Sequence, residues 1–98
     1  MTVDELLHSA TGDSQPPIEL SDPARALWET KAGNWDAAHD IVNDMHTPVG
    51  SWIHAHLHLI EGDLGNAGYW YSRAGRPSRT PDEIETEWLE IAAEVLGA

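Results

Sequence analysis

Histidine is the residue type whose spacing in this chain best fits a chemical site. Three of the six histidines, His54, His56 and His58, alternate along one short stretch. In a helix, His54 and His58 lie one turn apart on the same face, and Glu61 follows on that face. Two imidazoles at this spacing chelate Zn²⁺, Cu²⁺ or Ni²⁺, and a carboxylate one turn on completes the ligand set. The alternative is structural, with all three histidines satisfied by hydrogen bonds.

The other charged clusters offer less chemistry. Asp36, Asp40 and Asp44 recur at every fourth position, which is typical of a solvated helix face. Three of the five basic residues gather near one helix end, namely Arg73, Arg76 and Arg79. We expect them to pair with an acidic C-terminal helix or, secondarily, to hold an anion. The sequence has no cysteine and no glycine-rich phosphate loop, and no Ser/His/Asp set can be assembled. We therefore assign no catalytic residue, and the sequence leans against an enzyme.

Composition narrows the class of protein. The 98 residues suffice for one domain, and five tryptophans without any phenylalanine must supply most of the aromatic core. A net charge of −12 disfavours nucleic acid as a partner, because phosphate backbones are repelled. No apolar run approaches the ~18 residues of a membrane span, and no signal-peptide pattern is present. We therefore expect a cytoplasmic protein with no membrane partner.

Helix signals follow one another along the chain, without the alternation of a half-buried strand. Residues 1–20 are predicted to be a flexible or loosely docked segment, because 11–17 combine glycine, prolines and short polar side chains. A single helical domain is expected over 21–98. Ser21 with Pro23 indicates one helix start, and the capping box Thr80–Glu83 indicates another. We expect helices over about 22–32, 35–46, 49–61, 64–75 and 81–96.

An internal repeat organises this domain. Sliding the chain by 29 residues aligns 24–48 with 53–77. Each segment combines a helix, a glycine-containing turn, a small residue and then a bulky one four positions later. The small residue lets two helices approach closely, and the bulky one fills the space beside the crossing. Four residue pairs are identical: Ala26 with Ala55, Gly33 with Gly62, Ala38 with Ala67, and Pro48 with Pro77.

The segments G-N-W-D-A-A (33–38) and G-D-L-G-N-A (62–67) resemble the tetratricopeptide repeat. The run W-I-H-A-H-L-H-L-I-E-G-D-L-G-N-A-G-Y-W-Y-S-R-A-G (52–75) is also similar to short uncharacterised proteins with a W-x-H-x3-H…E-G-D signature, a likeness that implies a shared fold and no known activity. The repeat implies an all-α fold of two antiparallel helix-turn-helix units of tetratricopeptide-like type, closed by a C-terminal capping helix. In that helix we expect Ile84, Trp88, Ile91 and Val95 to face inward, and Glu83, Glu87, Glu90 and Glu94 to face water.

The helical wheel and the repeat place the histidines differently. The wheel puts His54 and His58 on the outer, polar side of their helix. The repeat alignment puts them in the seam with the preceding hairpin, where they meet His39 or Asp40. We favour the seam, because Ala55 and Ala67 match the expected close helix contact.

The same alignment bears on function. It places Trp52, His56 and Leu59 on the concave surface, where together with Arg73 they form the candidate ligand or partner surface. The alternative, which we favour, is that the capping helix covers this surface. Helical repeats mostly present a surface to another protein, so the leading hypothesis is a non-catalytic interaction or scaffold module without a cofactor. It would bind a peptide or protein as a monomer or weak homodimer. The alternative is a small metal- or ligand-binding protein that holds zinc or another divalent transition metal through His39, His54, His58 and Glu61.

Overall fold

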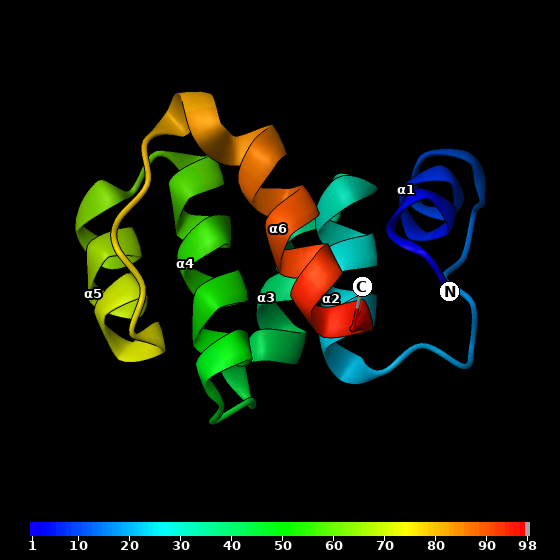
Figure 1. Ribbon diagram of the computed structural model, residues 1–98, viewed down its shortest axis with the longest axis horizontal. Coiled ribbons are helices and arrows are strands. Elements are labelled where there is room, and N and C mark those ends of the chain that lie inside the picture. Colours follow the sequence, from blue (N-terminus) through cyan, green and yellow to red (C-terminus); the bar gives the residue numbers. More distant parts are fainter. Residues whose placement is uncertain (98) are drawn as a thin grey trace.

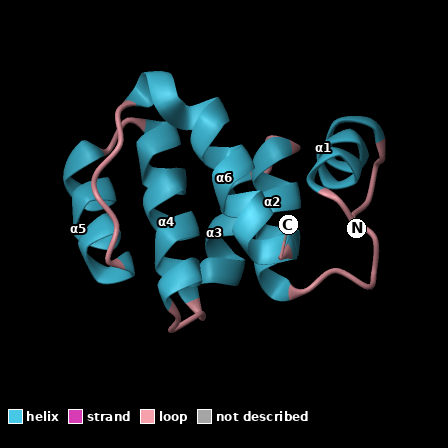
Figure 2. Cartoon of the chain, viewed as in Figure 1, coloured by secondary structure: helices cyan, strands magenta, loops and turns pink. Residues whose placement is uncertain are grey.

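The structure, a computed structural model, describes residues 1–97 and contains helices and loops but no strand in that range (Figures 1 and 2). The all-α fold class is thus confirmed. No helix in these residues has both the length and the apolar character needed to cross a membrane. The elements in chain order are α1 (Val3–Gly12), α2 (Asp22–Lys31), α3 (Trp35–Asn43), α4 (Pro48–Glu61), α5 (Leu64–Ala74), the 3-10 turn η1 (Pro81–Glu83) and α6 (Ile84–Leu96).

Local signals set the boundaries of the central helix, α4. The Thr47 side chain accepts a hydrogen bond from the backbone N–H of Gly50 and caps the start of α4. Gly62 ends α4 with a φ of +84°, a conformation that side chains other than glycine rarely adopt. Asp63 then caps α5 through the backbone N–H of Asn66. The tight break at Gly62 and Asp63 lets α5 fold back onto α4.

The helices pack in sequence and are then crossed by the last one. α2 packs on α3, α3 on α4 and α4 on α5, while α6 lies across α2 and α4 (Figure 1). Every residue of α4 from Gly50 to Leu59 is buried. The wheel prediction that one side of α4 faces water, with His54 and His58 on it, is therefore wrong. Because α3 and α5 pack on α4 and α2 and α6 also contact it, α4 is buried all round.

The tryptophans join the helices through their indole N–H groups. Each of four indoles donates a hydrogen bond to an acceptor on a different helix. The four pairs are Trp28 with Ser9 Oγ (3.0 Å), Trp35 with the Leu57 carbonyl (2.7 Å), Trp52 with Glu87 Oε2 (3.0 Å) and Trp88 with the Leu27 carbonyl (3.0 Å). These bonds tie α1 to α2, α3 to α4, α4 to α6 and α6 to α2, so the large rings fix orientation as well as fill volume.

The N-terminal segment holds a docked helix, where the sequence indicated only a flexible or loosely docked stretch. Thr2 and Glu5 form a capping box at the start of α1. Leu6 is fully buried and Ala10 nearly so, and α1 contacts both α2 and α6. Tertiary packing of this small apolar face therefore adds to the capping box in stabilising α1.

Candidate metal-binding site

Three imidazole rings from two helices meet in the seam between α3, α4 and α5. His39 comes from α3, and His54 and His58 from α4. One ring nitrogen from each lies within 4.8 Å of the others. The ring centroids are 4.6 Å apart for His39 and His54, 5.0 Å for His54 and His58, and 5.5 Å for His39 and His58. The seam is where the repeat alignment placed these residues.

The sequence explains how the three rings converge. His54 and His58 are one helical turn apart, so they stack on the same side of α4. Ala38, next to His39 on α3, and Ala55, next to His54 on α4, are both fully buried. Their small side chains permit the two backbones to come close enough for His39 to reach the α4 pair.

Two indoles enclose the histidine rings. The Trp35 ring stacks on His39 at 4.8 Å with an interplanar angle of 10°, and the Trp70 ring stacks on His54 at 3.8 Å with an angle of 9°. Trp35 is itself fixed by its hydrogen bond to the Leu57 carbonyl. This aromatic enclosure restricts the rotamers of the imidazoles and keeps much of the surrounding water away.

The electrostatic setting favours neutral imidazole. His54 is only 3% exposed, and burial lowers its pKa to about 4, with further lowering by the positive charge that His39 and His58 would carry. At neutral pH the His54 ring is therefore uncharged, which is the form that binds a metal ion. Nδ1 of His58 has a hydrogen-bond partner among residues 1–97. The other ring nitrogens of the three histidines have none in that range.

Glu61 supports His58 rather than joining the three-nitrogen group. Its Oε1 lies 2.6 Å from Nδ1 of His58, one turn along α4. A carboxylate in this position fixes the tautomer and leaves Nε2 of the imidazole to face a ligand. Asp63 lies near the same pair, and sequence reasoning missed it, although it follows Glu61 by only two positions. Asp63 already caps α5 through Asn66, and these hydrogen bonds lower the pKa of its carboxyl.

The residues expected on a concave partner surface lie under α6. Trp52, His56 and Leu59 are 3%, 0% and 1% exposed, so none of the three offers a free side chain to a partner in the described conformation. Arg73 is exposed and lies over the Tyr69 and Trp70 rings. The two other clustered arginines pair with the acidic C-terminal helix as expected, Arg76 with Glu94 and Arg79 with Glu90.

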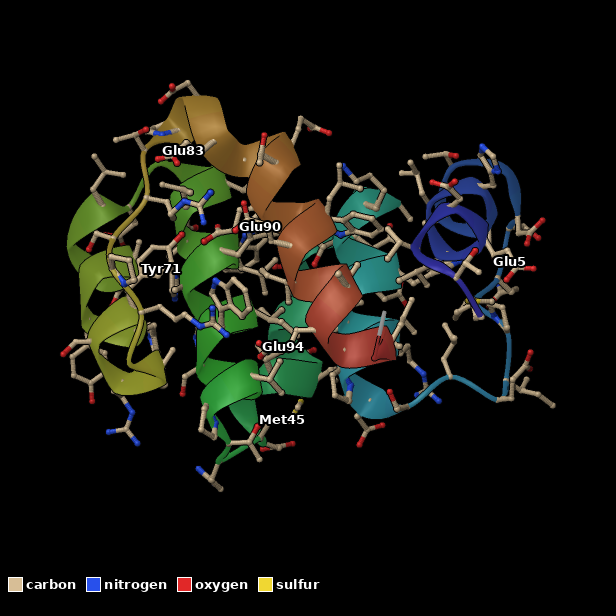
Figure 3. All side chains as sticks on the ribbon, in the orientation of Figure 1. Glu5, Met45, Tyr71, Glu83, Glu90 and Glu94 are labelled. Carbon is tan, nitrogen blue, oxygen red and sulfur yellow. The ribbon has the colours of Figure 1, made fainter. Side chains whose placement is uncertain are left out.

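The prediction that Glu87 faces water is wrong. Glu87 is fully buried and accepts hydrogen bonds from Trp52 Nε1 (3.0 Å), from the Tyr71 hydroxyl (2.7 and 2.8 Å) and from His56 Nδ1 (2.6 Å). Burial alone would raise the pKa of Glu87, but the bonds from His56 and Tyr71 hold it below its usual value. Tyr71 lies on α5, Glu83 is the last residue of η1, and Glu90 and Glu94 lie on α6 (Figure 3).

A sequence signal for Glu87 exists. Glu87 lies three residues after Ile84 and four before Ile91, at the edge of the apolar stripe of α6. Position alone does not distinguish an edge residue that faces water from one that bonds buried donors. The indole of Trp52, the imidazole of His56 and the hydroxyl of Tyr71 supply those donors from α4 and α5.

Comparisons with models of protein families, with curated proteins and with solved structures give no significant match to this chain.

Proposed function

We propose that this protein binds one divalent transition-metal ion, with zinc as the reference case, through His39, His54 and His58. The observation that carries the proposal is the convergence of three ring nitrogens within 4.8 Å, contributed by two helices. Imidazole nitrogen without thiolate suits Zn²⁺, Cu²⁺ and Ni²⁺. In a tetrahedral zinc site, ligand nitrogens about 2.0–2.1 Å from the ion are about 3.4 Å from one another. Small rotations of the three side chains close the remaining gap.

Three supporting features surround the ligands. The lowered pKa of His54 removes competition from protons at neutral pH. Glu61 orients His58 from its far side, in the position of a supporting carboxylate rather than a ligand. Trp35 and Trp70 limit access of water. Three protein ligands leave a fourth coordination position for water or a small external ligand.

The tetratricopeptide-like repeat provides the scaffold in this proposal. The second helix of the first unit supplies His39, and the first helix of the next unit supplies His54 and His58. The binding site is thus a property of the seam, and neither unit has it alone. The interaction module remains a prediction, but its expected groove would require Trp52, His56 and Leu59 to be free, and all three are buried.

The test is a zinc titration of protein purified without a metal-chelating column, followed by calorimetry and metal analysis. We expect one zinc per chain. His39→Gln and His54→Gln should each weaken zinc binding by at least about tenfold, because a ligand is lost. His8→Gln and His46→Gln are the matched controls, since both residues are exposed and lie outside the cluster. Absence of stoichiometric zinc, or equal losses in the control variants, would contradict the proposal.

A further inference from the structure

A cavity lies between α2, α4 and α6, away from the histidine cluster. Its volume is about 190 Å³, which is room for several water-sized groups. Thr30 and Lys31 of α2 line it, together with His56 and Ile60 of α4 and Glu85 and Trp88 of α6. The cavity shares no residue with the histidine cluster of the proposed metal site.

His56 lines this cavity and carries a buried polar atom without a partner. Its side chain is 1% exposed, and its Nδ1 is held 2.6 Å from Glu87 Oε1. Nε2 of His56 has almost no solvent-accessible area and no hydrogen-bond partner among the described residues. Such an atom costs about 1–3 kcal/mol if it stays unpaired. A hydroxyl group complements Nε2 of His56 whether or not that atom carries a proton, because a hydroxyl both donates and accepts hydrogen bonds.

The mouth of the cavity already binds a carboxylate. Lys31 Nζ lies 2.8 Å from Glu85 Oε2, and it also lies over the Trp88 ring at 4.9 Å. The side chain of Lys31 is 16% exposed, whereas that of Glu85 is 83% exposed. Lys31 is thus held in place by its surroundings, while Glu85 can swing into solvent at little cost.

We propose that this cavity binds a short hydroxycarboxylate. The ligand carboxylate replaces Glu85 on Lys31, the hydroxyl pairs with Nε2 of His56, and the carbon atoms of the ligand contact Trp88 and Ile60. Glu85 is then an internal competitor that occupies the ammonium group when no ligand is present. This site does not depend on the metal, and the two proposals fail separately.

The test is an NMR titration of ¹⁵N-labelled, metal-free protein, with the Trp88 indole N–H as reporter. Lactate is the probe, propionate lacks its hydroxyl, and 2-propanol lacks its carboxylate. We expect a saturable shift of the Trp88 signal with lactate, a weaker effect of propionate and none of 2-propanol. The absence of a saturable shift, or equal affinity for lactate and propionate, overturns the proposal.

Surface variants keep this test independent of folding. Glu85→Gln removes the competing carboxylate and should raise the affinity for lactate roughly two- to fivefold, the strength of an exposed ion pair. Lys31→Met should abolish binding. Glu94→Gln is the matched control, because Glu94 is also an exposed α6 residue with a basic partner, Arg76. An affinity that is unchanged in Glu85→Gln, or raised equally in Glu94→Gln, contradicts the role given to Lys31.

Discussion

Replacing Glu87 by leucine tests the buried polar cluster between α4, α5 and α6. The leucine side chain has a similar volume but cannot accept a hydrogen bond. The change leaves three buried donors without their acceptor: the indole of Trp52, the hydroxyl of Tyr71 and Nδ1 of His56. All three residues are at most 3% exposed, so water cannot readily replace the carboxylate.

The expected loss follows from these contacts. A buried donor left unpaired costs about 1–3 kcal/mol, and hydrogen bonds to a charged carboxylate are stronger than bonds between neutral groups. Some of the donors will turn toward other acceptors, so we expect Glu87→Leu to lower the free energy of unfolding by about 4 kcal/mol. That is a large part of the roughly 5–15 kcal/mol that stabilises a typical domain.

Urea unfolding at pH 7, followed by tryptophan fluorescence and circular dichroism, measures this loss. The control is Glu90→Leu, the same change on the same helix, where an exposed ion pair with Arg79 worth at most about 1 kcal/mol is lost. Tyr71→Phe should cost less in the Glu87→Leu background than in the wild type, because its hydroxyl no longer has an acceptor. Equal losses for Glu87→Leu and Glu90→Leu would refute the reasoning.

Three further predictions concern the histidine site and the N-terminal helix. The pKa of His54 is about 4 in the folded protein against an ordinary value of 6.5, so the unfolded chain binds more protons between these two pH values. The free energy of unfolding of the metal-free protein should therefore fall by at most about 3 kcal/mol as the pH drops from 6.5 to 4. Urea unfolding across this pH range should show a shallower fall in His54→Gln. Glu61→Ala should weaken zinc binding about tenfold or more while leaving one zinc per chain, as measured by calorimetry. Leu6→Ala should cost about 2–3 kcal/mol and speed amide exchange in α1 before the other helices, because it removes the anchor of that helix.

Local chemistry made the helices predictable. Ser21 caps α2, and Thr80 with Glu83 forms the capping box before α6, as their spacing indicates. The docking of α1 was not predictable in the same way. It depends on Leu6 packing against other helices and on the bond from Trp28 to Ser9, both of which are contacts between distant parts of the chain.

The two faces of α4 show how far sequence reasoning about the site extends. The i, i+4 spacing of His54 and His58 predicts that these rings share one face of α4, and in the structure both rings lie against His39. The other side of α4 depends on what α6 brings to it. The pairing of His56 with Glu87 joins two helices that are distant in the chain, and Glu87 lies outside the repeat, so no local pattern predicts this contact.

The most direct test of metal binding is a long-range ¹H–¹⁵N spectrum of the histidine rings, recorded before and after addition of one equivalent of zinc. The proposal predicts that one nitrogen in each of His39, His54 and His58 moves to the shift of a metal-bound imidazole, while His8 and His46 stay unchanged. Unchanged ring nitrogens in the three clustered histidines, or metal-induced shifts confined to His8 and His46, would contradict it.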